Sequence, residues 1–228
     1  MSNSPVTSKT QVSKLLSKPS LNQVDIVTIR PEFAEDLEVL QVRCFPTLAA
    51  SELMRKEHFL NHCKVFSEGN FVALVQGRVV GLGAGFLIDF DFDDPNHSFL
   101  DIIDGGYFGN HDPNGDYYYG ADISVDPDYR KQGIGRLLYE ARQGLVRRLN
   151  RKGIVAGGVL PGFANYKHLM SAGAYVQDVV AKRIYDRTLS FQLKNGFKVK
   201  GVLQDYIEDS ASDNWASLIV WENPDYRP

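Results

Sequence analysis

One segment, residues 122–138, constrains the fold of this chain more strongly than any other part of it. Branched and polar residues alternate up to Val125, a pattern typical of a half-buried strand. The Asp-Pro-Asp sequence at 126–128 then predicts a tight turn. Leu138 and Leu145 belong to an apolar repeat of three to four residues, which predicts an amphipathic helix over 135–150. We therefore expect a strand–turn–helix unit at this place.

The junction between this turn and the helix has the chemistry of an anion-binding site. Gly133 and Gly135 carry no side chain, so a ligand can approach the backbone closely. The amides of a first helical turn lack intrahelical partners, and the helix dipole adds positive potential. Arg130, Lys131 and Arg136 add positive charge. These features predict a pyrophosphate cradle, although the P-loop and Rossmann sequence patterns are not matched here.

The rest of the chain predicts further strands and helices in one mixed run. Alternating residues predict strands over 24–30, 71–75, 79–88, 117–125, 154–160, 197–206 and 215–221. Helices are expected from Pro31 to near Pro46, over 51–63, over 135–150, and as two or three helices within 163–195. This order predicts a single α/β domain over 24–228. The composition of residues 1–23 predicts a disordered tail, with a short helix at 12–16 as an alternative.

Two details of this prediction concern packing and the binding site. Leu37, Leu40 and Val42 are expected to form the core side of the first helix. The polar stretch at 89–116 is long for a loop, and loops of this length often form lids or substrate walls.

Several function classes are disfavoured by composition. The longest apolar runs are far shorter than the roughly 20 residues of a membrane-spanning helix. A net charge of −3 argues against nucleic-acid binding. Cys44 and Cys63 fit no zinc or redox spacing, and we expect two buried thiols. His58 and His62 have metal-compatible spacing but no third ligand, so we expect a solvated helix face and no metal site.

The segment at the helix start resembles a known signature. Arg130-x-x-Gly133-x-Gly135 resembles the acyl-CoA signature of the GNAT N-acetyltransferase superfamily, and the preceding 125–130 sequence is typical of it too. Residues 189–197 resemble the family's final helix-to-strand passage. The resemblance spans about residues 25–222. It extends, at 119–123, 137–142, 154–162 and 185–201, to a bacterial subgroup often fused to carbon–nitrogen hydrolase (nitrilase-like) domains, and no hydrolase domain is present here.

The resemblance implies a fold and an activity. The fold is an α/β, GNAT-like acyl-CoA N-acyltransferase fold: a central mixed, mostly antiparallel sheet with helices on both faces, splayed between the strands ending at Val125 and Leu160. The activity is transfer of an acetyl group from acetyl-CoA, as co-substrate, to an amine by direct attack in a ternary complex. The alternative is a non-catalytic module of the same fold that binds acyl-CoA or docks a partner.

The resemblance also implies residue roles. The backbone of Ile123, Ser124 and Val125 would bind the pantetheine arm, and the Val125 amide would stabilise the oxyanion. Arg130 would supply positive charge beside the pyrophosphate, which would lie on the amides of the turn and first helical residues: Lys131, Gln132, Gly133, Ile134, Gly135 and Arg136. A basic cluster at 142–152 either reaches the 3′-phosphate of CoA or forms a solvated helix face.

The sequence departs from the family at the acid and base positions. Gln192 occupies the place of the usual acidic tyrosine, so Tyr185, two turns earlier if the helix extends that far, is the candidate acid. Tyr119 stands where some members have a glutamate base, and Asp122 is the nearest strand carboxylate. A water-relayed base or a substrate arriving as free amine are alternatives. Tyr119 and Asp122 face opposite sides of a regular strand, so both can face the thioester only if a β-bulge intervenes.

The expected partners and location complete this hypothesis. The acceptor would be a small amine or a peptide amine, with no nucleic acid and no membrane involved. A homodimer and a separately encoded amidase partner are left open. Location in a bacterial cytoplasm is expected because two free thiols suit a reducing compartment.

Overall fold

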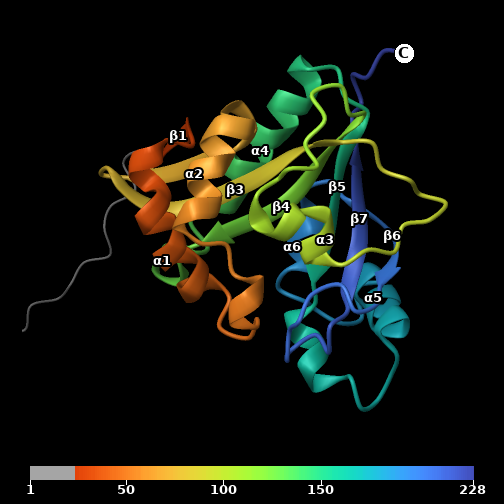
Figure 1. Cartoon of the computed structure of the whole chain (residues 1–228). Helices are drawn as coiled ribbons and strands as arrows, with labels where there is room; N and C mark the ends of the chain where they lie inside the picture. Colours follow the sequence, from red (N-terminus) through yellow and green to blue (C-terminus); the bar gives the residue numbers. More distant parts are fainter. Residues whose placement is uncertain (1–23) are drawn as a thin grey trace, which may run out of the picture.

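The computed structural model describes residues 24–228, and the predicted tail at 1–23 with its helix at 12–16 lies outside the described residues. The seven strands of this part of the chain join in one sheet, in the order β1-β2-β3-β4-β5-β7-β6 (Figure 1). Their bounds are β1 Val24–Thr28, β2 Phe71–Val75, β3 Arg78–Ile88, β4 Tyr117–Val125, β5 Gly153–Val159, β6 Lys198–Leu203 and β7 Ala216–Glu222.

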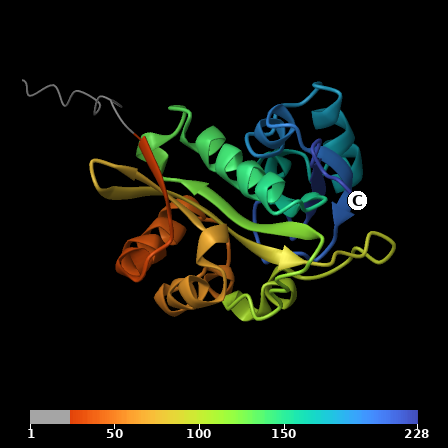
Figure 2. The ribbon, with the colours of Figure 1, turned by 90° about the horizontal axis from the view of Figure 1, so that it is seen from above.

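The sheet is mixed, and helices cover both of its faces. β4 and β5 pair in parallel, whereas the other neighbouring strands pair antiparallel. One face carries α1 (Ala34–Cys44), α2 (Lys56–Val65) and the short α3 (Phe99–Ile102), and the other carries α4 (Ile134–Arg148), as Figure 2 shows. α5 (Ala172–Val180) packs on β6 and on α6 (Leu189–Lys194). This is the predicted fold class.

The parallel pair of β4 and β5 opens after a few residues. Their register joins 117–119 only to 153–155, and beyond this point the two strands separate. The predicted splay therefore lies between the ends of β4 and β5. Separated strands leave backbone hydrogen-bonding groups on both facing edges available to an extended ligand.

β4 also contains an irregularity that changes which way its side chains face. Asp122 pairs with Ala84, but Gly120 pairs with Gly85, so Ala121 is an extra residue on β4. Such a bulge shifts the alternation of side chains by one position. Tyr119 and Asp122 consequently face the same side of the sheet, the side of α1 and α2. The bulge that the sequence required for this arrangement is present.

The first helix corrects one core assignment. Leu37 and Leu40 are buried as predicted, but Val42 is 60% exposed, and Gln41 is buried in its place. The cause is helical geometry, since positions 37, 41 and 44 share one face while 42 points away from it. The helical path begins with a 3-10 turn at Pro31–Phe33, and α1 ends at Cys44. Gln41 consequently points toward β4, where its side-chain amide donates to Asp122.

The segment predicted as a lid or wall is largely ordered. Residues 89–98 form a loop, which is followed by α3 and the 3-10 turn Asp104–Gly106. This turn contacts α2, since His62 lies within hydrogen-bond distance of the Gly106 carbonyl. His62 stacks on Phe108 and His58 contacts Tyr107 edge-on. His62 is fully buried, so the predicted solvated face of the two histidines is wrong. No helix within 24–228 has the length and apolar character to cross a bilayer.

Candidate active site

A cavity of about 550 Å³ runs along the splay between β4 and β5. Its wall is built from segments that are far apart in the sequence. They are residues 41–54, the end of β4 at 120–125, the 129–136 turn, β5 at 156–159, the segment 185–192 that leads into α6, and the 206–209 loop. One cavity therefore brings together the predicted anion cradle, the strand end and the segment leading into α2.

The cradle at the start of α4 has the predicted geometry. Lys131 (φ 62°) and Gly133 (φ 87°) both adopt left-handed backbone conformations. Leu137 makes the first hydrogen bond of the helix, donating its amide to the Gly133 carbonyl, so the amides of the preceding turn lack helical carbonyl partners. A Cβ atom added at Gly133 would have no atom within 4 Å. The turn is therefore open to an anion on the cavity side.

The second glycine of the signature has a different role from the one expected. A Cβ atom at Gly135 would lie 2.9 Å from Cζ of Phe191. Phe191 belongs to α6, and its ring also contacts Tyr139 of α4. Gly135 therefore lets α6 pack closely against α4. The signature combines one glycine for ligand approach with one for helix packing.

The end of β4 presents its backbone to the splay. The Asp126 amide donates to the Val80 carbonyl of β3 at 2.9 Å. Because successive amides of a strand point to opposite edges, the Val125 amide points away from β3, toward the splay. Arg130 donates through Nε to the Val125 carbonyl at 2.9 Å, which fixes the strand end to the turn. Ile123, Ser124 and Val125 all line the cavity.

Asp122 is a buried carboxylate on the cavity wall. One oxygen accepts a hydrogen bond from Nε2 of Gln41, and the other, Oδ1, has no partner among the described residues. Burial raises the pKa of Asp122 to about 6, although the Gln41 hydrogen bond, the nearby Arg142 guanidinium and the Ser124 hydroxyl act in the opposite direction. A carboxylate with this pKa is ionised at neutral pH and can still accept a proton.

Arg142 is buried rather than part of a solvated helix face. Its guanidinium lies over the Tyr118 ring and donates to the Ala84 carbonyl at 2.6 Å. It is 2% exposed, so the surface expected for residue 142 is wrong. The sequence pattern contained the signal, since 138, 142, 145 and 149 share the apolar face of the helix.

Tyr119 lies in a hydrogen-bonded chain that the sequence did not indicate. Its hydroxyl lies 2.8 Å from Nε2 of His97 and 2.9 Å from the hydroxyl of Tyr206. Tyr206 lines the cavity, whereas Tyr119 is fully buried behind it. His97 comes from the 89–98 loop. Burial raises the pKa of both tyrosines, so both are protonated phenols at neutral pH.

Tyr185 does not lie on the helix that its candidate role required. α6 begins at Leu189, and Tyr185 precedes it, 77% exposed at the rim of the cavity. The cause is Asp186, whose Oδ1 accepts the amides of Thr188 and Leu189 and so starts the helix after itself. Gln192, at the family's tyrosine position, is buried on the cavity wall.

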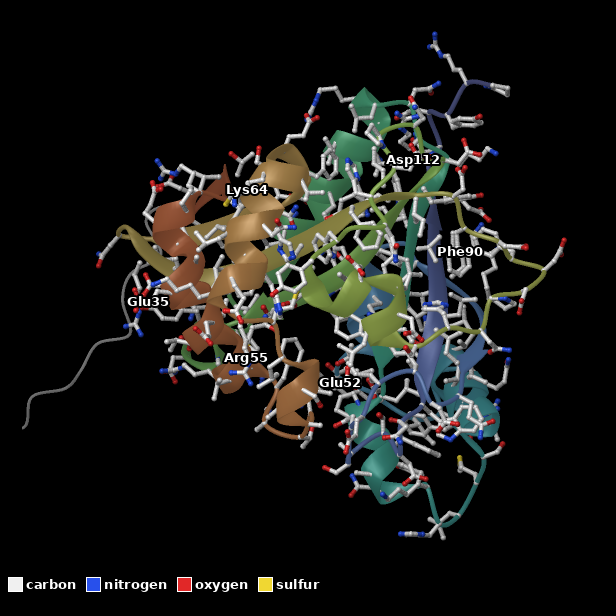
Figure 3. The ribbon with its side chains drawn as sticks, in the orientation of Figure 1. Glu35, Glu52, Arg55, Lys64, Phe90 and Asp112 are labelled. Carbon is white, nitrogen blue, oxygen red and sulfur yellow. The ribbon has the colours of Figure 1, made fainter. Side chains whose placement is uncertain are left out.

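Glu52 is a second buried carboxylate that the sequence analysis missed. It lies in the 3-10 turn Ala50–Glu52, which leads toward α2, and faces the C-terminal half of the sheet (Figure 3). Its Oε1 accepts the Glu208 amide at 3.1 Å, and its Oε2 has no partner among the described residues. Burial raises its pKa. Glu52 lines the same cavity as Asp122, and its negative charge contributes to the raised pKa of Tyr206.

The two cysteines differ in their burial. Cys44 is buried on the cavity wall, while Cys63 is half-buried, so only one of the two expected buried thiols is fully buried. Burial, and then the charge of Asp122, raise the pKa of Cys44 to about 11. Within residues 24–228, no group of three or more His, Cys, Asp or Glu is placed to hold a metal ion.

Comparison with known proteins places this site in a family. The profile of the acetyltransferase (GNAT) family matches residues 34–156, which is more than half of the chain. The chain belongs to the GNAT acetyltransferase family. It is also similar to YkwB of Bacillus subtilis (strain 168), an uncharacterized N-acetyltransferase, with 38% identity over 209 residues that cover 89% of this chain and 92% of YkwB.

A second relative is much longer than this chain. YhcX of Bacillus subtilis (strain 168), a probable hydrolase, is 43% identical over 190 residues, which cover 83% of this chain but 36% of YhcX. The chain thus spans about a third of the length of that relative. Among solved structures, the GNAT-like decarboxylase GphF in complex with isobutyryl-CoA matches with a TM-score of 0.74 at 22% identity, over 87% of this chain and 99% of that chain. This likeness confirms the GNAT fold.

Proposed function

We propose that this chain transfers an acetyl group from acetyl-CoA to a primary amine. The observation that carries the proposal is one continuous cavity, whose wall includes both the open cradle at Gly133 and Asp122, a buried carboxylate with one unpartnered oxygen. The similarity to YkwB and the isobutyryl-CoA bound to GphF support a CoA thioester as co-substrate.

The cradle residues fit a pyrophosphate on physical grounds. The space beside Gly133 is open, and the amides of the first turn of α4 lack helical partners. Lys131 and Arg136 carry positive charge on the cavity wall. The backbone of Ile123 to Val125 would hold the pantetheine arm along the splay, which places the thioester near Asp122.

The chemistry proposed for this chain uses two of its groups. Asp122 takes a proton from the ammonium of the acceptor, which frees the nitrogen lone pair for attack on the thioester carbonyl. The Val125 amide donates to the oxygen that becomes negative in the tetrahedral intermediate. Cys44 keeps its proton because its pKa is about 11, which supports direct attack without a thioester on the enzyme.

The charges of the cavity favour a cationic acceptor. Apart from the buried Arg142, its cations come from residues 130, 131, 136 and 187, while its carboxylates come from other segments: Glu52, Asp122 and Asp209. Asp209 is satisfied by the amides of Ala211 and Ser212. Glu52 and Asp122 each keep a buried oxygen without a partner, and an ammonium group would supply the missing donors.

Glu52→Gln is expected to raise the KM for the amine roughly tenfold, with little change in the Kd for acetyl-CoA. The reason is that Gln keeps the hydrogen bond to the Glu208 amide but removes the negative charge, and hydrogen bonds to charged groups are worth about 1.5–3 kcal/mol. Initial rates at varied amine concentration and calorimetry with acetyl-CoA measure the two constants.

The matched control for this variant is Glu208→Gln, because Glu208 is exposed and its hydrogen bond to Glu52 comes from the backbone amide, which the substitution keeps; only the small contribution of the Glu208 charge to the pKa of Glu52 is lost. The raised pKa of Glu52 predicts that amine affinity weakens as the pH falls through that pKa, and that Glu52→Gln lacks this dependence. An unchanged amine KM in Glu52→Gln would show that the acceptor binds elsewhere.

The proposed function is tested by measuring CoA release with acetyl-CoA and a panel of amines, polyamines, amino acids and peptide N-termini. Release that depends on one class of amine, with the acetylated amine identified by mass spectrometry, supports the transferase. Binding of acetyl-CoA without release in any reaction supports the alternative, a non-catalytic acyl-CoA-binding or partner-docking module.

The similarity to YhcX also supports membership of the bacterial subgroup in which this domain is joined to a hydrolase. A separately encoded amidase partner, a homodimer and location in the cytoplasm stay predictions, as does the division into a tail at 1–23 and one domain over 24–228.

A further inference from the structure

The hydrogen-bonded chain of His97, Tyr119 and Tyr206 connects the cavity to the 89–98 loop. Its three links measure 2.9 Å from Tyr206 to Tyr119, 2.8 Å from Tyr119 to His97, and 2.7 Å from His97 Nδ1 to the Pro95 carbonyl. All three lie within ordinary hydrogen-bond distance. The chain therefore forms an unbroken path from the cavity wall to a half-buried imidazole.

The Pro95 carbonyl fixes the direction of every donor in this chain. A carbonyl only accepts, so Nδ1 of His97 carries the proton, and Nε2 of the neutral ring is an acceptor. Tyr119 must then donate to His97, and Tyr206 must donate to Tyr119. The Tyr206 oxygen is left as an acceptor only; the Gly157 backbone amide is one donor to it, and its other lone pair is available to the cavity.

The surroundings hold the chain in place. The imidazole of His97 meets the rings of Phe90, Tyr119 and Tyr206 edge-on, with centroids 5.5–5.6 Å apart. The loop that carries Tyr206 is tied to α3, since the Phe99 amide donates to the Tyr206 carbonyl. Phe90 lies in the 89–98 loop, just beyond the end of β3 at Ile88 (Figure 3). Rings and backbone together fix the position of each hydroxyl.

The cavity end of the chain depends on a glycine of β5. A Cβ atom at Gly157 would lie 2.6 Å from the Tyr206 hydroxyl and 2.3 Å from its ring carbon Cζ. Residue 157 is beyond the point where β4 and β5 separate. The Tyr206 hydroxyl therefore lies directly on the backbone of the splay, where the acceptor amine would meet the thioester.

We propose that His97, acting through Tyr119 and Tyr206, is the terminal proton acceptor of a relay that deprotonates the amine bound at the splay. The proposal rests on the proposed function and adds a second route for protons beside Asp122. It assigns a catalytic role to Tyr206, which would touch the substrate, and positioning and proton-accepting roles to Tyr119 and His97.

The reaction moves two protons, and the two routes account for both of them. An ammonium nitrogen loses two protons on its way to an amide. Asp122 takes one and returns it to the departing thiolate, so CoA leaves as a thiol. The other passes from the nitrogen to the Tyr206 oxygen while the Tyr206 proton moves to Tyr119 and the Tyr119 proton moves to Nε2 of His97. The imidazolium then releases one proton to solvent, and the C–N bond has replaced the C–S bond.

His97 suits this role because burial lowers its pKa below the ordinary value, which keeps the ring neutral near pH 7. The groups that face it are Tyr119, Tyr206 and Asp101 of α3, and the carboxylate of Asp101 opposes the shift. Protonation of His97 at low pH would fill Nε2 and block the relay. The rate carried by the relay is therefore expected to rise with pH through the lowered pKa of His97.

The test compares His97→Gln, Tyr119→Phe and Tyr206→Phe, with Tyr118→Phe as the matched control. Tyr118 is the neighbouring tyrosine of β4, is equally buried, and its hydroxyl donates to the Gly69 carbonyl, outside the relay. Glutamine at 97 can still accept from Tyr119 but does not take up a proton. We expect kcat with the acceptor amine to fall about 10²-fold in each relay variant, with the Kd for acetyl-CoA unchanged.

Combined variants and the pH profile distinguish a relay from three structural contacts. If the residues act as one path, the double variant His97→Gln/Tyr119→Phe loses no more activity than either single variant. In the wild type, protonation of His97 is expected to lower kcat at low pH. The rate that remains in His97→Gln is expected to lack this pH dependence. A normal kcat and pH profile in His97→Gln, in a protein that turns over an amine, would overturn the relay but leave the transferase standing.

A measurement without turnover separates the relay from the proposed function. Nitrogen NMR of the ligand-free protein, with the ring signals assigned through His97→Gln, is expected to show His97 as the Nδ1–H tautomer. The Nε2–H tautomer would reverse the donors and overturn the relay, whatever the activity. Absence of both acetyl-CoA binding and turnover in the wild type would instead contradict the proposed function.

Discussion

Gly133→Glu is expected to abolish acetyl-CoA binding while the fold stays intact. The added side chain would start in open space, since no atom lies within 4 Å of the Cβ position, so the core is not disturbed. It would place a carboxylate where the first-turn amides of α4 would hold a pyrophosphate, and like charges repel strongly at such a site. Calorimetry with acetyl-CoA is expected to show no measurable heat of binding, and circular dichroism a native spectrum.

The control is Gly133→Ala, because the backbone strain and the added charge must be separated. Gly133 has a φ of 87°, a conformation that costs any L side chain about 1–3 kcal/mol. Alanine carries this strain without the negative charge, so it should bind acetyl-CoA more weakly than glycine but far better than glutamate. Wild-type affinity in a folded Gly133→Glu protein would remove the cradle from the binding site.

The parts of the site that could be predicted are those encoded by neighbouring residues. The strand, the Asp-Pro-Asp turn and the helix start over 122–138 are determined by local alternation, turn residues and helix periodicity, and the structure places them as predicted. The turn from Lys131 to Gly133 follows from the same local chemistry. The separate packing role of Gly135 required knowledge of Phe191, which lies 56 positions later.

The parts that could not be predicted depend on contacts between distant segments. His97, Tyr119 and Tyr206 lie in a polar loop, a buried strand and a turn, and their spacing follows no helix or strand period. Glu52 contacts the 206–209 loop, which pairs with the segment before α2, and this contact joins residues 156 positions apart. Tyr185 shows a local error instead: the capping role of Asp186 was readable in the sequence and would have placed the start of the helix after Tyr185.

Asp122→Asn is expected to lower kcat by about 10²- to 10⁴-fold, the usual contribution of a general base, with acetyl-CoA affinity near wild type. Asparagine keeps the shape of the side chain and a carbonyl oxygen for Gln41, but it does not take a proton from the ammonium. Because burial raises the pKa of Asp122 to about 6, the wild-type rate should rise as the pH increases through 6. The variant should lack this part of the pH profile. Asp225→Asn, an exposed change that affects only an ion pair with Arg147, serves as the control.

The same shift predicts an opposite effect on stability, which makes the assignment testable without a substrate. A pKa raised above the unfolded value of 3.8 means that the folded state holds this proton more tightly, so the stability it gives is lost as the pH rises through 6. The loss approaches about 3 kcal/mol above pH 6, since each pKa unit corresponds to about 1.4 kcal/mol. Asp122→Asn should therefore unfold at a higher temperature than the wild type at pH 8 and at a similar one at pH 4. A gain in stability together with a loss of turnover would identify Asp122 as a buried charge that destabilises the fold and serves catalysis. Unchanged turnover over the whole pH range would instead show that Asp122 is a structural residue, and that water or the Tyr206 relay accepts the proton.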